Sequence, residues 1–109
     1  MARPRRLSPT VLDRLVPQLE GFVREGDELR AAYRLPSFLG AIAFVQRLAE
    51  HAEQLDHHPD LTIRYTRVDV LVTTHDANGL TRLDLDLAER AAAVARAHGA
   101  KPLPPERRT

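Results

Sequence analysis

The 109-residue sequence lacks cysteine and tryptophan, and its aromatic residues are only three phenylalanines and two tyrosines. Without cysteine the chain can form no disulfide and can use no thiolate as a nucleophile or metal ligand. This composition favours a reducing compartment, so we expect a cytoplasmic protein. So few aromatic rings leave the core to Leu, Val, Ile and Ala, and they argue against stacking on several nucleobases.

The sequence also lacks long apolar runs and a strong excess of either charge. No stretch approaches the roughly 20 apolar residues that span a bilayer, and the basic start, residues 1–6, is not followed by the apolar segment of a secretory signal. Sixteen basic residues nearly balance fifteen acidic ones, for a net charge of +1. Because nucleic acid binding usually needs a strongly basic face, we expect neither direct nucleic acid binding nor membrane insertion.

What the sequence does contain is an ordinary globular balance of 43% hydrophobic and 28% charged residues. A chain of this length can form one core but not two. We expect residues 1–7, which are basic and contain proline, to be disordered. Residues 8–99 then form the domain, and residues 100–109 form a polar, proline-rich, disordered tail.

Three segments have the apolar spacing of amphipathic helices. The first begins at Ser8 and ends at Gly21, the second runs from Phe38 to about Leu55, and the last begins at Thr81 and ends at Gly99. The buried stripe of the second helix is predicted to consist of Phe38, Ala41, Ile42, Val45, Leu48, Ala49, Ala52 and Leu55. Pro59 cannot continue this helix.

Two pairs of strands are predicted between the helices, over residues 22–25 with 28–35 and residues 62–65 with 68–75. One face of the last strand carries Val68, Val70, Val72 and Thr74. The order α-β-β-α-β-β-α indicates an α+β fold in which helices cover one face of a four-stranded antiparallel sheet. Pairing of its exposed edge strands across a two-fold axis predicts a homodimer or homotetramer.

Histidine dominates one stretch of the chain, Glu53-Gln-Leu-Asp-His57-His58-Pro59, which is followed by Tyr65, His75 and Asp84. The unperturbed pKa of histidine lies nearest neutrality, so a histidine cluster can supply both an acid and a base at pH 7. The pattern therefore predicts the active site of an enzyme.

The spacing of these residues resembles the signature of the pterin-4a-carbinolamine dehydratases. The match includes the flanking Thr73-Thr74-His75-Asp76 and Gly79-Leu80, and it extends over roughly residues 48–88. The predicted order of elements also agrees with that family's fold. The resemblance implies dehydration of 4a-hydroxytetrahydropterin to quinonoid dihydropterin, a step of tetrahydrobiopterin recycling, without a metal or any other cofactor.

The resemblance also implies roles for individual residues. His57, His58 and His75 would be catalytic, with His75 as the acid toward the hydroxyl, His57 as the base toward the ring N–H, and His58 orienting the substrate. Glu53, one turn before His57, would hold its imidazole, and Asp84 would support the site. The residues implied to bind the substrate are Pro59, Thr73, Thr74 and Asp76.

Several of these residues also have a purely structural interpretation. His57 and His58 could satisfy backbone carbonyls at a helix end. Asp84 stands where the carboxylate of a capping box would follow Thr81, an interpretation at least as favoured as a supporting one. Tyr65 is better interpreted as a packed aromatic residue of a strand.

A metal site is a weaker alternative, because the adjacent His57 and His58 are poorly spaced as ligands on one helix face and no HExxH motif accompanies them. His51 and His98 are most simply surface residues of helices.

The rival function is a protein-interaction module. Relatives of this family are associated with partner proteins, as dimerisation cofactors or as assembly factors, and would bind them through the outer helical surface. Non-enzymatic relatives can lose members of the histidine set. This chain keeps all three, which favours the enzyme without excluding a protein partner.

Overall fold

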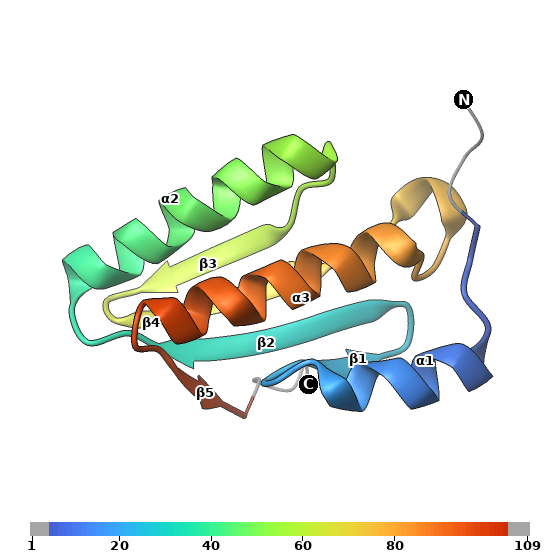
Figure 1. Ribbon diagram of the computed structural model, residues 1–109, viewed down its shortest axis with the longest axis horizontal. Coiled ribbons are helices and arrows are strands. Elements are labelled where there is room, and N and C mark those ends of the chain that lie inside the picture. Colours follow the sequence, from blue (N-terminus) through green and yellow to red (C-terminus); the bar gives the residue numbers. More distant parts are fainter. Residues whose placement is uncertain (1–4, 105–109) are drawn as a thin grey trace.

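A five-stranded sheet and three α-helices make up the part of the chain that the structure describes, residues 5–104 of a computed structural model (Figure 1). The elements in chain order are α1 (Pro9–Leu15), the 3₁₀ turn η1 (Val16–Gln18), β1 (Val23–Glu25), β2 (Glu28–Arg34), α2 (Phe38–Leu55), β3 (Asp60–Arg64), β4 (Arg67–Val72), the 3₁₀ turn η2 (His75–Ala77), α3 (Arg82–Ala97) and β5 (Lys101–Leu103). Within these residues no helix is long and apolar enough to cross a membrane.

The sheet is antiparallel throughout, in the order β1-β2-β4-β3. β4 pairs along one side of β2, and the other side is shared: β1 pairs with its first half and β5 with its second. The helices cover one face (Figure 1). The predicted α+β fold, with an antiparallel sheet covered by helices on one face, is confirmed.

The core lies between the helices and the two central strands. Leu29, Ala31 and Tyr33 of β2 stand opposite Val72, Val70 and Val68 of β4. All six are buried, as the alternation of apolar residues predicted. Against them pack buried residues of the long helices, namely Ala41, Phe44, Leu48 and Ala52 of α2 and Leu87, Ala88, Ala91 and Ala95 of α3.

The stripe predicted for α2 is partly wrong. Phe44, which the prediction omitted, is fully buried, whereas Phe38, Ile42 and Ala49 are exposed. The Phe44 and Tyr33 rings form a T-shaped pair with a centroid distance of 5.7 Å. Burying this large ring rotates the helix and leaves the face that carries Phe38 and Ile42 outside the core.

Both predicted disordered ends contain ordered residues. Lys101–Leu103 form β5 opposite Ala32–Arg34, because the short strand β1 leaves half of that side of β2 unpaired. At the other end, the Leu7 N–H donates to the Leu80 carbonyl at 2.8 Å. The remainder of the two predicted tails, residues 1–4 and 105–109, lies outside the described residues.

Some element boundaries also differ from the prediction. α1 ends at Leu15 and continues only as the turn η1, since Pro17 has no N–H to donate to the helix. β4 ends at Val72, so His75 belongs to η2. Tyr65 is not a packed strand residue: it lies in the hairpin turn between β3 and β4, with φ +53° and 75% exposure.

Candidate active site

The end of α2, the segment after β4 and the start of α3 meet at one end of the sheet. α2 ends at Leu55, and Asp56 adopts a left-handed conformation, with φ +49°, that turns the chain. His57 follows, and its N–H closes the helix end on the Ala52 carbonyl at 3.1 Å. Because β3 and β4 are antiparallel, the start of β3 after His58 lies beside the end of β4 before Thr74.

The centre of this region is the carboxylate of Asp84, whose side chain is 0% exposed. Its Oδ1 is 2.6 Å from His57 Nε2. Its Oδ2 accepts hydrogen bonds from the Thr74 hydroxyl at 2.7 Å and from the Thr81 N–H at 2.8 Å. His57 is itself largely buried, with 11% of its side chain exposed. The fold thus joins His57, Thr74, Thr81 and Asp84 in one hydrogen-bonded cluster.

Asp84 combines the two interpretations that the sequence left open. It forms a capping box at the start of α3, in which its carboxylate accepts from the Thr81 backbone while the Thr81 hydroxyl accepts from the Leu83 N–H at 3.3 Å. The other carboxylate oxygen is directed to His57. One side chain therefore both starts the helix and holds a histidine.

Glu53 holds a different histidine from the one expected. Its Oε2 is 2.5 Å from Nε2 of His58, in a pair whose side chains are 56% and 77% exposed. The prediction that Glu53 positions His57 is wrong, because it assumed helical spacing between the two residues. α2 ends before His57, so that spacing does not apply.

His75 lies beside the cluster rather than in it. It is exposed at the start of η2 and lines a hollow of about 230 Å³ whose lining residues are Asp27, Glu28, Thr73, Thr74, His75, Asn78 and Gly79. The Thr73 hydroxyl donates to the Asp27 carbonyl at 2.5 Å. Of the residues expected to bind substrate, Thr73 and Thr74 line this hollow. Asp76 and Pro59 are not among its lining residues.

The turn between β1 and β2 contributes residues to this region that the sequence did not indicate. Asp27 and Glu28 lie where the sequence predicts only the connection between two strands and the start of the second, yet both line the hollow beside His75. The register explains their position, because Leu29 pairs with Val72 and so brings the turn next to Thr73 and Thr74. Only a correct prediction of the pairing between β2 and β4 could have shown that this turn lies beside His75.

The remaining two histidines belong to neither group. His98 is half-buried rather than a surface residue. Its ring forms a T-shaped pair with the Phe44 ring at a centroid distance of 6.4 Å, and its Nδ1 lies 2.9 Å from the Val94 carbonyl oxygen. Burial, together with Arg47 and Arg90, lowers the pKa of His51. Within residues 5–104, no group of three or more His, Asp or Glu side chains is placed to hold one metal ion.

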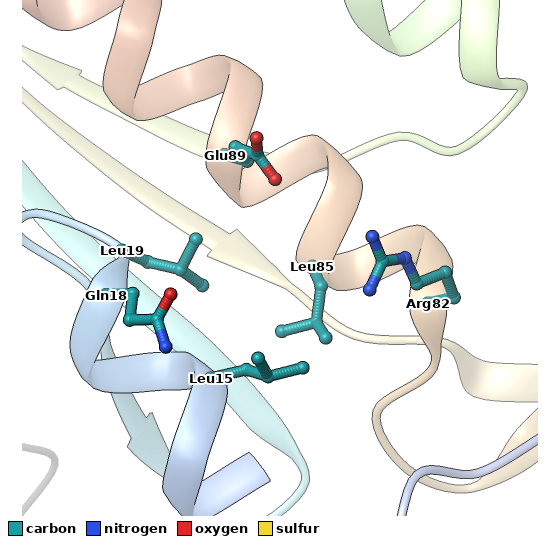
Figure 2. Close-up of a pocket in the computed structure, with 6 residues that line it drawn as sticks. All are labelled: Leu15, Gln18, Leu19, Arg82, Leu85 and Glu89. Atoms are coloured by element: carbon teal, nitrogen blue, oxygen red, sulfur yellow. The ribbon is translucent and has the colours of Figure 1, made fainter. Parts of the chain in front are cut away.

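A second hollow, of about 330 Å³, lies between α1, η1 and α3 (Figure 2). Leu15, Leu19 and Leu85 supply apolar side chains, and the polar lining residues are Gln18, Arg82 and Glu89. Figure 2 shows Arg82 and Leu85 on the first turn of α3. No histidine lines this hollow, so it is not the site predicted from the sequence.

Fold and site together define a small antiparallel α+β domain in which carboxylates hold two histidines and a third stands beside them. A family model described as pterin 4 alpha carbinolamine dehydratase matches residues 5–94. The chain belongs to this family.

Individual relatives agree with this assignment. The chain is 48% identical to a protein of Thermosynechococcus vestitus, over 77% of this chain and 88% of the relative, and 46% identical to one of Thermomicrobium roseum, over 83% and 97%. Both are provisionally named pterin-4-alpha-carbinolamine dehydratases.

Two solved structures have the same fold. One is a transcriptional coactivator/pterin dehydratase from Brucella melitensis, with a TM-score of 0.79 and 33% identity over 84% of this chain and 99% of that one. The other is a pterin dehydratase-like protein identified as a RuBisCO assembly factor, with a TM-score of 0.57 and 20% identity over 68% of this chain and 86% of that one. At that identity the second likeness concerns the fold alone.

Proposed function

We propose that the protein dehydrates 4a-hydroxytetrahydropterin to quinonoid dihydropterin by acid–base catalysis with free imidazoles, as a step of tetrahydrobiopterin recycling. The observation that carries this proposal is the 2.6 Å contact between His57 Nε2 and the buried carboxylate of Asp84. Membership of the family supports the substrate class. The cytoplasmic location stays a prediction.

The contact with Asp84 supports Nδ1 as the nitrogen of His57 that would react. A carboxylate accepts hydrogen bonds, so Nε2 carries the proton that points to Oδ1. In the neutral ring Nδ1 then holds the free lone pair. His57 is therefore prepared to accept a proton through Nδ1, which suits the base that removes the ring N–H proton of a carbinolamine.

We assign the role of the acid to His75, which is exposed at the start of η2. As His57 removes the N–H proton, the nitrogen lone pair forms the C=N bond and breaks the C–O bond, and His75 protonates the departing hydroxyl to give water. One proton has then moved onto His57 and one has left His75. Because His75 is exposed, solvent can restore its proton, while His57 releases the one it gained.

His58 and Glu53 form the outer part of the proposed site. Their side chains are more than half exposed, so a substrate can reach them without any movement of the core. We assign His58 to substrate orientation, with Glu53 restricting its ring through the Nε2 contact. Thr73 would contact the pterin from the hollow beside His75.

The test is the rate at which quinonoid dihydropterin forms from freshly generated 4a-hydroxytetrahydropterin, with a chelator present. We expect wild type to accelerate the reaction and His57→Ala or His75→Ala to lose about 10²- to 10⁴-fold of that acceleration, the usual contribution of a general acid or base. His51→Ala is the matched control. His51 lies on the same helix as Glu53, but its side chain contacts Arg90 and none of the three candidate catalytic histidines. No acceleration by folded wild type would refute the proposed function.

We also propose that the chain associates with itself. β3 is the last strand of the sheet order, and among residues 5–104 no strand pairs with its outer side, where another β3 could pair. A second surface is the apolar side of α2 outside the core, where Leu39 is 79% exposed and Phe38 and Ile42 are also exposed. Two such surfaces would allow either a dimer or a dimer of dimers. The same side of α2 would receive a partner protein under the alternative, non-enzymatic function.

A further inference from the structure

The hydrogen bonds around Asp84 permit only one direction for the Thr74 hydroxyl. Thr74 Oγ1 lies 2.7 Å from Asp84 Oδ2 and 2.9 Å from Thr81 Oγ1. A carboxylate supplies no proton, so the single hydroxyl hydrogen of Thr74 must point to Asp84. The Thr81 hydroxyl then donates to Thr74, and it accepts in turn from the Leu83 N–H. The chain of donors runs from the start of α3 through both threonines to the carboxylate.

This arrangement leaves little freedom to the carboxylate. One oxygen of Asp84 accepts from Thr74 and from the Thr81 backbone, and the other oxygen is left for His57. Thr74, Thr81 and Asp84 are all buried, so water does not replace a lost donor easily. Without the Thr74 hydroxyl, Oδ2 would keep the Thr81 N–H and the long 3.5 Å contact from the Thr81 hydroxyl, but it would lose its shortest hydrogen bond, and the carboxylate could rotate away from His57.

Thr74 is also tied to the segment that carries His75. Its N–H donates to the Gly79 carbonyl at 3.2 Å, and its carbonyl accepts from the Ala77 N–H at 3.1 Å. These bonds close the loop around η2, in which His75 is the residue next to Thr74. The backbone of Thr74 therefore fixes the loop of His75, while its side chain fixes the partner of His57.

We propose that Thr74 is a positioning residue that sets the proposed base and the proposed acid relative to each other, rather than a residue that binds the pterin. This inference rests on the proposed function. It departs from the substrate-binding role that the family resemblance implied for Thr74, because the hydroxyl is buried and already engaged by Asp84 and Thr81.

The test compares Thr74→Val, which keeps the shape and removes the hydroxyl, with Thr74→Ser, which keeps the hydroxyl. Thr66→Val is the matched control, because Thr66 is also buried and its hydroxyl accepts from Arg34 at 2.9 Å at the opposite end of the sheet. We expect Thr74→Val to lower kcat by about 10- to 100-fold, the usual cost of removing an outer-shell partner, with KM changed less than about twofold. Thr74→Ser should restore most of kcat.

Nuclear magnetic resonance of the imidazole protons gives a measurement that does not depend on activity. The proton on His57 Nε2 should give a protected signal in wild type, Thr74→Ser and Thr66→Val, and the signal should broaden or disappear in Thr74→Val. Thr74→Val with a raised KM and an unchanged kcat would overturn the inference in favour of substrate contact. So would an unchanged His57 signal in folded Thr74→Val. If wild type has no dehydratase activity but the signals behave as expected, the positioning of His57 holds and the proposed function fails.

Discussion

Tyr33 and Asp84, which are among the fully buried residues with polar side chains, show how the core accommodates such groups. Asp84 receives partners on both carboxylate oxygens, and its partners belong to the candidate site. The Tyr33 hydroxyl donates to the Glu20 carbonyl at 3.0 Å and serves only the fold. Each residue is satisfied by a group from a distant part of the chain, so each depends on the complete tertiary structure.

Tyr33 makes the stability of the fold sensitive to alkaline pH. Burial, followed by the nearby Glu20, raises the pKa of Tyr33 well above its ordinary value of 10.0. Below pH 10.0 both the folded and the unfolded chain keep the phenol proton of Tyr33, and the contribution of Tyr33 to stability is fully present. Above pH 10.0 the unfolded chain ionises first, and the free energy of unfolding should fall by up to about 1.4 kcal/mol per pH unit.

The test compares two chains by urea unfolding at a series of alkaline pH values. Both carry Tyr65→Phe, so that Tyr65 does not titrate. One keeps Tyr33 and the other also carries Tyr33→Phe. The Tyr33→Phe chain should be about 1 kcal/mol less stable at neutral pH, because it lacks the hydrogen bond to Glu20. The difference between the two chains should shrink as pH rises beyond 10.0. Parallel curves would contradict the assigned cause.

Sequence could predict the residues of the candidate site better than their pairing. The clustering of histidines, whose unperturbed pKa lies near neutrality, pointed to His57, His58 and His75 from the sequence alone. The partners of His57 and His58 depend on where α2 ends and on how α3 docks, which local spacing does not determine. The prediction for Glu53 failed for this reason. The packed role predicted for Tyr65 failed because β3 ends at Arg64 and leaves Tyr65 in the hairpin turn.

Among the elements, the segment before α1 is held against the loop of the candidate site. Arg6 pairs with Asp27 at 3.8 Å, and its side chain crosses the face of Gly79. A Cβ at Gly79 would lie only 2.7 Å from Arg6 Nε. Gly79 does not have a left-handed φ, so its missing side chain serves this close approach rather than the backbone conformation.

Replacing Gly79 should therefore have opposite effects with and without Arg6. In wild type, Gly79→Ala displaces Arg6 and should lower the free energy of unfolding by about 0.5 to 1 kcal/mol. In an Arg6→Ala background the clash is absent, and the same change should stabilise by about 0.4 to 1 kcal/mol, because it restricts the unfolded chain. A double-mutant cycle in urea measures the coupling.

Gly26→Ala is the control for this cycle. Gly26 has φ +58° and nothing within 4 Å of a Cβ, so its replacement should destabilise equally in both backgrounds. An identical effect of Gly79→Ala with and without Arg6 would show that the two residues do not interact in solution.

At the level of elements, the hydrophobic period predicted both long helices and both hairpins, because those signals are local. The hydrophobic period did not predict features that depend on contacts with residues distant in the sequence. The rotation of α2 is set by the contact of Phe44 with Tyr33, and β5 exists because β1 is too short to pair with all of β2. A three-residue strand containing Pro102 has no periodicity of its own to detect.

For the whole molecule, the exposed apolar side of α2 is a feature that a single copy leaves unexplained. We expect wild type to sediment as a dimer or larger assembly. Leu39→Glu should reduce the mass of the sedimenting assembly, because the substitution places a charge on that surface. The free energy of unfolding of the single chain should change little, since Leu39 is 79% exposed.

Ala93→Glu supplies the matched control for this experiment, because it adds the same charge at an exposed position of α3. The sedimenting assembly of Ala93→Glu should have the same mass as that of wild type. A wild-type monomer would refute self-association, and an unchanged mass in Leu39→Glu would remove α2 from the interface and leave the open edge of β3 as the candidate.

The shared side of β2 has a consequence for the order in which the fold can form during synthesis. β1 reaches β2 across a two-residue turn, whereas β5 must bring Leu103 to Ala32 after every other described element has been made. Until then, the backbone of residues 32–34 offers unpaired hydrogen-bonding groups on that side of β2. A growing chain on the ribosome would carry this open segment for most of its translation, and a chaperone that binds extended strands would find its natural target there.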